Sequence, residues 1–195
     1  MSSGLSVKVT PKKKIEIERL VYFRQKKSFA YMLEKGRPAS INALDLFEFN
    51  LKREYGFEAD VRDLPSDCEG LTDFSTNELV LSVASHAQLG NNEPRGIFTV
   101  CHELGHIDMH KSDMSHCHLS RVKGRQLYRR RGDIKAFECS EWQADYYSGS
   151  LQMPYMQVVD ILEQGGDEGD LQRIFNVSFT AARKRVGYVN SLRKG

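Results

Sequence analysis

His102, Glu103 and His106 are the residues of the sequence best suited to chemistry. A spacing of four residues places both imidazoles on one side of an α-helix, about 6 Å apart, which suits one tetrahedral zinc ion. Zinc lowers the pKa of a bound water from about 16 to about 7, and an adjacent carboxylate takes the proton and passes it to a leaving amine. The motif therefore predicts hydrolysis of a carbonyl substrate, most simply a peptide, with Glu103 as general base and acid.

Two histidines leave a zinc ion half-ligated, and the predicted third ligand is Glu141. It lies in a helical pattern over residues 136–151, on the same face as Ala144, Asp145 and Ser148. A His-His-Glu set leaves the fourth position open for water, as in catalytic zinc sites. Asp145 is expected to accept the outer N–H of a ligand histidine, and the small Ala144 and Ser148 permit another helix to approach closely.

His110 is predicted to lie outside the set of ligands. It is eight residues from His102, about 12 Å along the axis, so a straight helix cannot present both to one ion. A structural role, or a role supporting a ligand, is expected instead. The arrangement His-Glu-x-x-His-x-x-Gly-x-x-His is excluded, because Met109 and Ser112 stand where glycine and histidine are required.

The helix that carries the histidines is expected over residues 96–110, introduced by Asn91, Asn92 and Pro94. Apolar residues recur on its opposite side at helical spacing and predict a buried face. These residues are Ile97, Val100, Cys101, Leu104 and Ile107. The predicted helix therefore has one packing face and one chemical face.

The preceding part of the chain is expected to supply two helices and a small sheet. Residues 1–14 are predicted to form a flexible lead-in, and helices are expected over residues 15–35 and 40–56, the second capped by Ser40. Alternating patterns predict strands at residues 57–61 and 78–83, with a turn region at Gly70-Leu71-Thr72-Asp73. We expect a small antiparallel sheet, whose free edge could bind an extended peptide.

Residues 111–135 lack periodicity and contain a basic cluster. Its members are Arg121, Lys123, Arg125, Arg129, Arg130, Arg131 and Lys135, with Tyr128 among them. A solvated, mobile insertion is the favoured interpretation, and attraction of an acidic partner or phosphates is the alternative.

The C-terminal residues 154–195 are predicted to form a helical hairpin packed on the preceding domain. Pro154 suits the first turn of a helix, and residues 171–192 follow as helix, turn and helix. The core is expected from Leu171, Ile174, Phe175, Val177, Ala181 and Val186. The same pattern resembles half of a helix-turn-helix DNA reader with Arg183, Lys184 and Arg185 free for phosphates, so a DNA-binding regulator with structural zinc is the alternative function.

Composition indicates a globular chain of 195 residues with one main core, since 40% of its residues are hydrophobic. No apolar run of about 18 residues and no signal peptide are found, so a cytoplasmic protein without a membrane partner is expected. The net charge of +2 is too small to imply nucleic-acid binding. Four cysteines without Cys-x-x-Cys spacing predict no disulfides, although His116, Cys117, His118 and Cys139 are an alternative second metal set.

Two blocks of residues resemble the ImmA/IrrE metallopeptidases of bacteria and their mobile elements. The first block comprises His102, Glu103, Gly105, His106 and His110, and the second comprises Glu141, Ala144, Asp145, Met153 and Pro154. The likeness covers about residues 15–190 and is interrupted by the long basic stretch and by Tyr146-Tyr147.

This resemblance implies an α+β fold, mostly helical and zincin-like, with a peptidase domain at residues 15–153 that includes the 111–135 insertion. It implies a gluzincin-like zinc endopeptidase that inactivates a helix-turn-helix repressor and so relieves repression of a mobile element or a stress response. The oxyanion-stabilising group stays open among Tyr128, Tyr146, Tyr147 and the basic arginines. A protein-binding module that keeps the zinc fold without proteolysis is a further alternative.

Overall fold

The computed structural model describes residues 5–122, 128–130 and 134–193, with side-chain surroundings for residues 6–113 and 134–193. The longer helices are α1 (Lys14–Ser28), α4 (Val83–Gly90), α5 (Pro94–Val122), α6 (Ser140–Gln152), α7 (Tyr155–Glu163), α8 (Glu168–Phe175) and α9 (Phe179–Arg193). Short helices are α2 (Ala43–Asp45) and α3 (Leu51–Tyr55), with a π-helical segment at Leu46–Asn50 between them and 3-10 segments at Ala30–Leu33 and Ala136–Glu138. The strands are β1 (Leu5–Val7), β2 (Glu58–Arg62), β3 (Gly70–Asp73), β4 (Glu78–Ser82) and β5 (Tyr128–Arg130).

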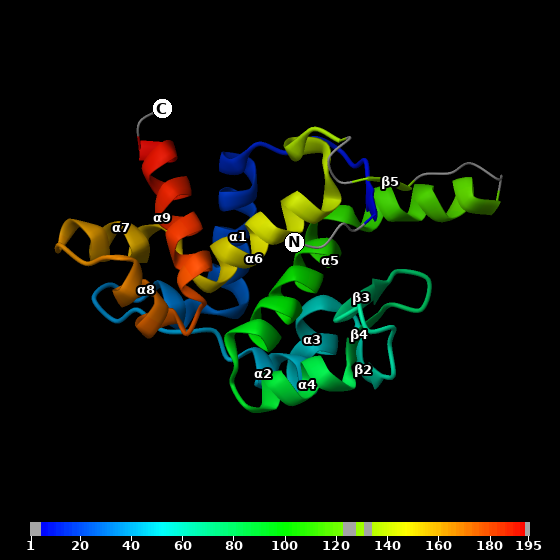
Figure 1. Ribbon diagram of the computed structural model, residues 1–195, viewed down its shortest axis with the longest axis horizontal. Coiled ribbons are helices and arrows are strands. Elements are labelled where there is room, and N and C mark those ends of the chain that lie inside the picture. Colours follow the sequence, from blue (N-terminus) through cyan, green and yellow to red (C-terminus); the bar gives the residue numbers. More distant parts are fainter. Residues whose placement is uncertain (1–4, 123–127, 131–133, 194–195) are drawn as a thin grey trace.

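Helix α5 runs through the middle of the molecule, with α6 packed across it (Figure 1). The three-stranded sheet lies on one side of α5, and α7 to α9 lie on the opposite side of the molecule (Figure 1). The expected α+β, mostly helical class is confirmed. The predicted end of α5 near His110 is wrong, because the helix continues to Val122 into the segment expected to be irregular.

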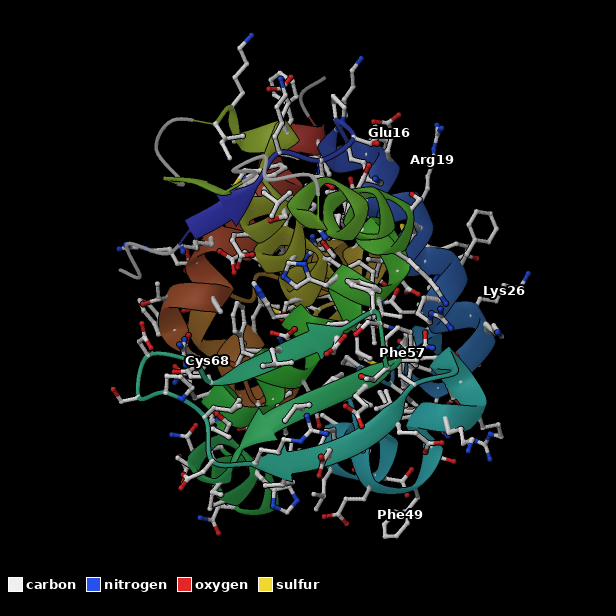
Figure 2. The ribbon with its side chains drawn as sticks, turned by 90° about the vertical axis from the view of Figure 1, so that its right-hand side faces the viewer. Glu16, Arg19, Lys26, Phe49, Phe57 and Cys68 are labelled. Carbon is white, nitrogen blue, oxygen red and sulfur yellow. The ribbon has the colours of Figure 1, made fainter. Side chains whose placement is uncertain are left out.

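The sheet is mixed, so the prediction of an antiparallel sheet is wrong. The two predicted strands, β2 and β4, pair in parallel, and the expected turn region at residues 70–73 is itself a strand. This strand, β3, pairs with β4 in antiparallel register, Leu71 opposite Val80, and the order is β2-β4-β3. Figure 2 shows the molecule from the side on which these three strands lie.

The first two helical regions are shorter and more broken than predicted. Helix α1 ends at Ser28 rather than continuing to residue 35. The second region is capped by Asn42, whose side chain accepts the N–H of Asp45, and not by Ser40. Its π-helical segment directs Phe47 inward and Phe49 outward, with exposed fractions of 3% and 75%; Figure 2 shows Phe49 projecting from the body.

Two hydrophobic clusters hold these elements together. The larger gathers buried side chains from α1, the broken second region, the sheet, α5 and α6, and it includes Cys101 and Leu104, both fully buried as expected. The smaller joins Met153 to the three C-terminal helices and includes Leu171, Phe175 and Val177. The helix predicted after Pro154 and the following helix, turn and helix are all present as α7, α8 and α9, and the three helices share this core.

Arg185 does not stand free for phosphates as the DNA-reader alternative requires. Its side chain is 1% exposed and makes an ion pair with Glu18 of α1. The guanidinium also donates to the Met153 carbonyl oxygen at 2.9 Å and to Ser150 Oγ at 2.9 Å. This buried pair ties α9 to α1 and α6.

Part of the predicted flexible lead-in is packed into the fold. Strand β1 pairs antiparallel with β5, and Val7 and Val9 are buried. Of the predicted basic cluster at residues 121–135, Lys135 is described and is exposed, with Nζ 5.9 Å from the centroid of the Phe137 ring. The side chains of its other members, like those of His116, Cys117 and His118, lie outside the described residues. Among the described cysteines, Cys68, Cys101 and Cys139 are free thiols. No helix of the described chain is long and apolar enough to span a membrane.

Candidate metal centre

Helices α5 and α6 approach closely where their predicted chemical faces meet. A Cβ atom at Gly105 would lie 3.2 Å from Ala144 Cα, so glycine at this position lets the two backbones come together. One turn further along, Ser148 Oγ donates to the Phe98 carbonyl oxygen at 3.1 Å. The close crossing brings Glu141 of α6 to the two histidines of α5.

Three predicted ligand atoms converge at this crossing. His102 Nε2 lies 3.1 Å from His106 Nε2 and 3.2 Å from a Glu141 carboxylate oxygen, and His106 Nε2 lies 3.5 Å from the other oxygen. Zinc–ligand bonds of about 2.0–2.1 Å in a tetrahedron put neighbouring ligand atoms about 3.3 Å apart. The spacing of the three groups therefore fits one small tetrahedral metal ion.

The three groups polarise one another strongly. Burial opposes the charged form of His102, but hydrogen bonds to Asp145 and Glu141 outweigh it and raise its pKa to about 10. Burial likewise opposes the charged form of Glu141, yet its bond to His102 and the charges of both histidines lower its pKa to about 2. Burial and the charge of His102 lower the pKa of His106 to about 4. A metal cation bound between the three groups would neutralise the Glu141 carboxylate in place of the proton on His102.

Glu103 lies beside the three converging groups and is buried, with 6% of the residue exposed. Burial raises the pKa of Glu103, which makes its carboxylate a better proton acceptor than an exposed glutamate. Thr72 of β3 donates its hydroxyl to Glu103 Oε2 at 2.8 Å and so holds the carboxylate in place. The sequence interpretation missed Thr72, because it read residues 70–73 as a turn.

Asp145 accepts a hydrogen bond from the outer ring nitrogen of His102, at 3.0 Å. This bond holds a proton on Nδ1 and directs Nε2 toward His106 and Glu141. Asp145 therefore contacts the histidine as the sequence analysis expected, and its role in supporting a metal ligand stays a prediction.

His110 bonds to the outer ring nitrogen of His106, so it lies behind that residue. The two Nδ1 atoms are 2.9 Å apart, and His110 Nε2 lies 3.1 Å from Gln143 Oε1. Gln143, fully buried on α6, is a second residue that the sequence interpretation missed. Gln143 lies two residues from both Glu141 and Asp145, on a different face of α6, so the helical pattern that singled out those two residues gave no signal for it.

A cavity of about 250 Å³ opens over the cluster. One wall is β3, represented by Gly70, Leu71 and Thr72, and Val7 from β1 closes another side. Within the described chain β3 pairs with β4 along one edge only, so its other edge is unpaired there.

Two of the tyrosines considered for oxyanion stabilisation point elsewhere. Tyr146 donates its hydroxyl to Glu18 at 2.8 Å, and Tyr147 donates to Asp108, and both rings are buried. The considered Tyr128 and the arginines of the basic cluster lie outside the described side chains. Tyr146 and Tyr147 are therefore structural.

Comparison with known proteins places this site in a family. A family model described as the IrrE N-terminal-like domain, a peptidase domain, matches residues 86–186, which contain both helices of the site. The chain belongs to this family. The match confirms the resemblance to ImmA/IrrE proteins, and no curated protein matches the chain.

A solved structure described as a Mycobacterium tuberculosis transcriptional regulator shares the fold of this IrrE-like chain. The TM-score is 0.52 at 18% sequence identity, over 86% of this chain and 55% of the other. This chain therefore spans little more than half the length of that regulator. At this identity the likeness concerns the fold.

Proposed function

We propose that the protein is a zinc-dependent endopeptidase with His102, His106 and Glu141 as the metal ligands. The observation that carries the proposal is the convergence of three ligand atoms at 3.1–3.5 Å beside the buried carboxyl group of Glu103. Two nitrogen donors and one carboxylate form a set that zinc prefers, and it leaves a coordination position for water or substrate.

The residues divide the work of hydrolysis between them. When bound, zinc supplies a Lewis acid that acidifies a water molecule and polarises the scissile carbonyl. Glu103 accepts the proton of the attacking water, a step that its raised pKa favours, and then delivers that proton to the leaving amine. Thr72 holds the Glu103 carboxylate through the bond to Oε2, and Asp145 orients His102.

A polypeptide is the substrate class that fits the cavity. We infer that an extended substrate adds as a further strand to the edge of β3 that β4 leaves unpaired within the described chain, next to the β3 residues that line the cavity. Such pairing aligns a peptide bond along the strand beside Glu103, because Thr72 belongs to that strand and contacts the carboxylate.

The proposed substrate is a helix-turn-helix repressor, whose inactivation would relieve repression of a mobile element or a stress response. Membership of the IrrE-like family supports this assignment, as does the fold shared with a transcriptional regulator. The alternative, a DNA-binding regulator without proteolysis, is less well supported, because Arg185 is buried against Glu18. Arg183 and Lys184 of the predicted phosphate contacts are exposed.

Co-expression with a helix-turn-helix repressor from the same genome tests the proposal. We expect wild-type protein to cut the repressor at one position found by mass mapping, and Glu103→Gln to leave it intact. Glu93→Gln, an exposed position just before α5, is the matched control and should cut normally. Binding of the repressor without cleavage by wild type, or cleavage by Glu103→Gln, would contradict the proposal.

A further inference from the structure

We propose that Gln143 fixes the proton positions of His110 and His106, so that His106 presents an unprotonated Nε2 to the metal. This inference rests on the proposed metal centre and deepens it. Gln143 touches no ligand atom, so it is a positioning residue that acts through His110.

The backbone determines which way the Gln143 amide faces. Its Nε2 donates to the Thr10 carbonyl oxygen at 3.0 Å and to the Phe137 carbonyl oxygen at 2.8 Å. These two bonds use both amide hydrogens, and a flipped amide would point its oxygen at two carbonyl oxygens. The oxygen Oε1 is therefore the atom that faces His110.

The orientation of the amide determines the tautomer of His110. An amide oxygen only accepts, so His110 Nε2, 3.1 Å away, must carry a hydrogen. His110 is fully buried, and among the described residues its two ring nitrogens bond to the uncharged Gln143 amide and the His106 ring, so burial keeps its own ring neutral. Its Nδ1 then has a lone pair.

The tautomer of His110 in turn determines that of His106. The two Nδ1 atoms are 2.9 Å apart, so His106 Nδ1 carries the hydrogen of this bond. A neutral His106 ring is left with a lone pair on Nε2, the atom that faces His102 and Glu141. A relay of fixed proton positions therefore runs from two backbone carbonyls to the ligand atom.

Removal of the Gln143 amide removes the hydrogen bond that fixes the tautomer of His110. In Gln143→Leu the N–H of His110 loses its acceptor, and His110 can instead protonate Nδ1. His106 Nδ1 must then accept, which moves its hydrogen to Nε2, where it blocks the metal. Loss of a group that orients a ligand histidine typically weakens metal binding by about 10-fold to 100-fold.

Two measurements test the inference in the full chain. Competition with a chromogenic chelator should show zinc binding weakened about 10-fold or more in Gln143→Leu. In the metal-free protein, proton–nitrogen NMR correlations of the histidine rings should assign the hydrogen of His106 to Nδ1 in wild type and to Nε2 in the variant.

Gln152→Leu is the matched control. Gln152 lies on the same helix with 1% exposure, and its amide donates only to Ser148 of its own helix. We expect this variant to lose stability but to bind zinc as wild type does. Gln143→Glu keeps an oxygen acceptor facing His110 and, with its carboxyl group protonated by burial between two carbonyl oxygens, donates to one of them in place of two, so it should regain part of the zinc affinity that Gln143→Leu loses.

Wild-type zinc affinity in Gln143→Leu, or an equal loss in Gln152→Leu, would overturn the positioning role. If Gln143→Leu does not fold, the wild-type NMR assignment decides, and a hydrogen on His106 Nε2 refutes the relay. His106→Ala separates this inference from the metal centre itself. Unchanged zinc binding in His106→Ala would refute the centre, whereas loss there with wild-type affinity in Gln143→Leu would refute only the relay.

Discussion

The buried ion pair between Arg185 and Glu18 should dominate the response of the fold to mutation. Replacement of Arg185 by methionine keeps most of the side-chain volume and removes the charge. The variant leaves the Glu18 carboxylate, 8% exposed, with only the hydroxyl donors of Tyr146 and Ser150 at 2.8 and 3.0 Å. Removal of one partner of a buried pair costs about 3–5 kcal/mol, a large part of an ordinary domain's stability of about 5–15 kcal/mol.

Urea denaturation followed by circular dichroism measures this loss as a fall in the midpoint at constant slope. Arg183→Met, on the exposed side of the same helix, is the control and should change stability by less than about 0.5 kcal/mol. In the double variant with Glu18→Gln, no charge is left buried, so part of the lost stability should return.

The loss should also depend on pH. The Glu18 pKa is lowered, because its interactions with Arg185 outweigh the effect of burial. Wild type therefore holds this stability above the pKa of an unfolded glutamate, about 4.3, and loses it as pH falls through the folded pKa. Without Arg185, burial raises the Glu18 pKa, so Glu18 of the variant becomes protonated and uncharged as the pH falls. The difference in free energy of unfolding between variant and wild type should therefore narrow from pH 7 to pH 4. A loss below about 1 kcal/mol at pH 7, the range of surface pairs, would refute the reasoning.

Three further substitutions probe the site. Thr72→Val removes the bond to Glu103, worth about 1.5 kcal/mol or more, so kcat should fall about 10-fold while zinc content, measured by mass spectrometry, stays the same. Asp145→Asn should weaken zinc binding about 10-fold to 100-fold in chelator competition, because the ligand histidine loses its carboxylate partner. Gly105→Ala places a Cβ 3.2 Å from Ala144 Cα and should lower the free energy of unfolding, measured in urea, by about 1–3 kcal/mol. Unchanged stability would show that α6 can move away from α5 at little cost.

The chemical face of α5 could be predicted because helical spacing is a local property. Positions 102 and 106 lie one turn apart in any α-helix, so the approach of their imidazoles follows from the sequence alone. The approach of α6 could be anticipated from Ala144, but the distances that Glu141 adopts depend on the crossing of two helices about 40 residues apart.

The missed features depend on contacts between distant segments. Strand β3 has four residues and begins with glycine, and its place is set by pairing with β4 rather than by its own pattern. The burial of Arg185 follows from Glu18, which lies 167 residues earlier in the chain. The amide of Gln143 is held by the carbonyl of Thr10, 133 residues away, and no periodicity signals such a bond.

Zinc content and repressor cleavage, measured together in two glutamate variants, test the central claim most directly. Glu141 is proposed to hold the metal and Glu103 to move the proton, although both carboxylates lie at the same centre. We predict that Glu141→Gln loses both zinc and cleavage, whereas Glu103→Gln keeps about one zinc per chain and loses cleavage. Full zinc content in Glu141→Gln, or cleavage at the wild-type rate by zinc-loaded Glu103→Gln, would contradict the assignment of these two roles.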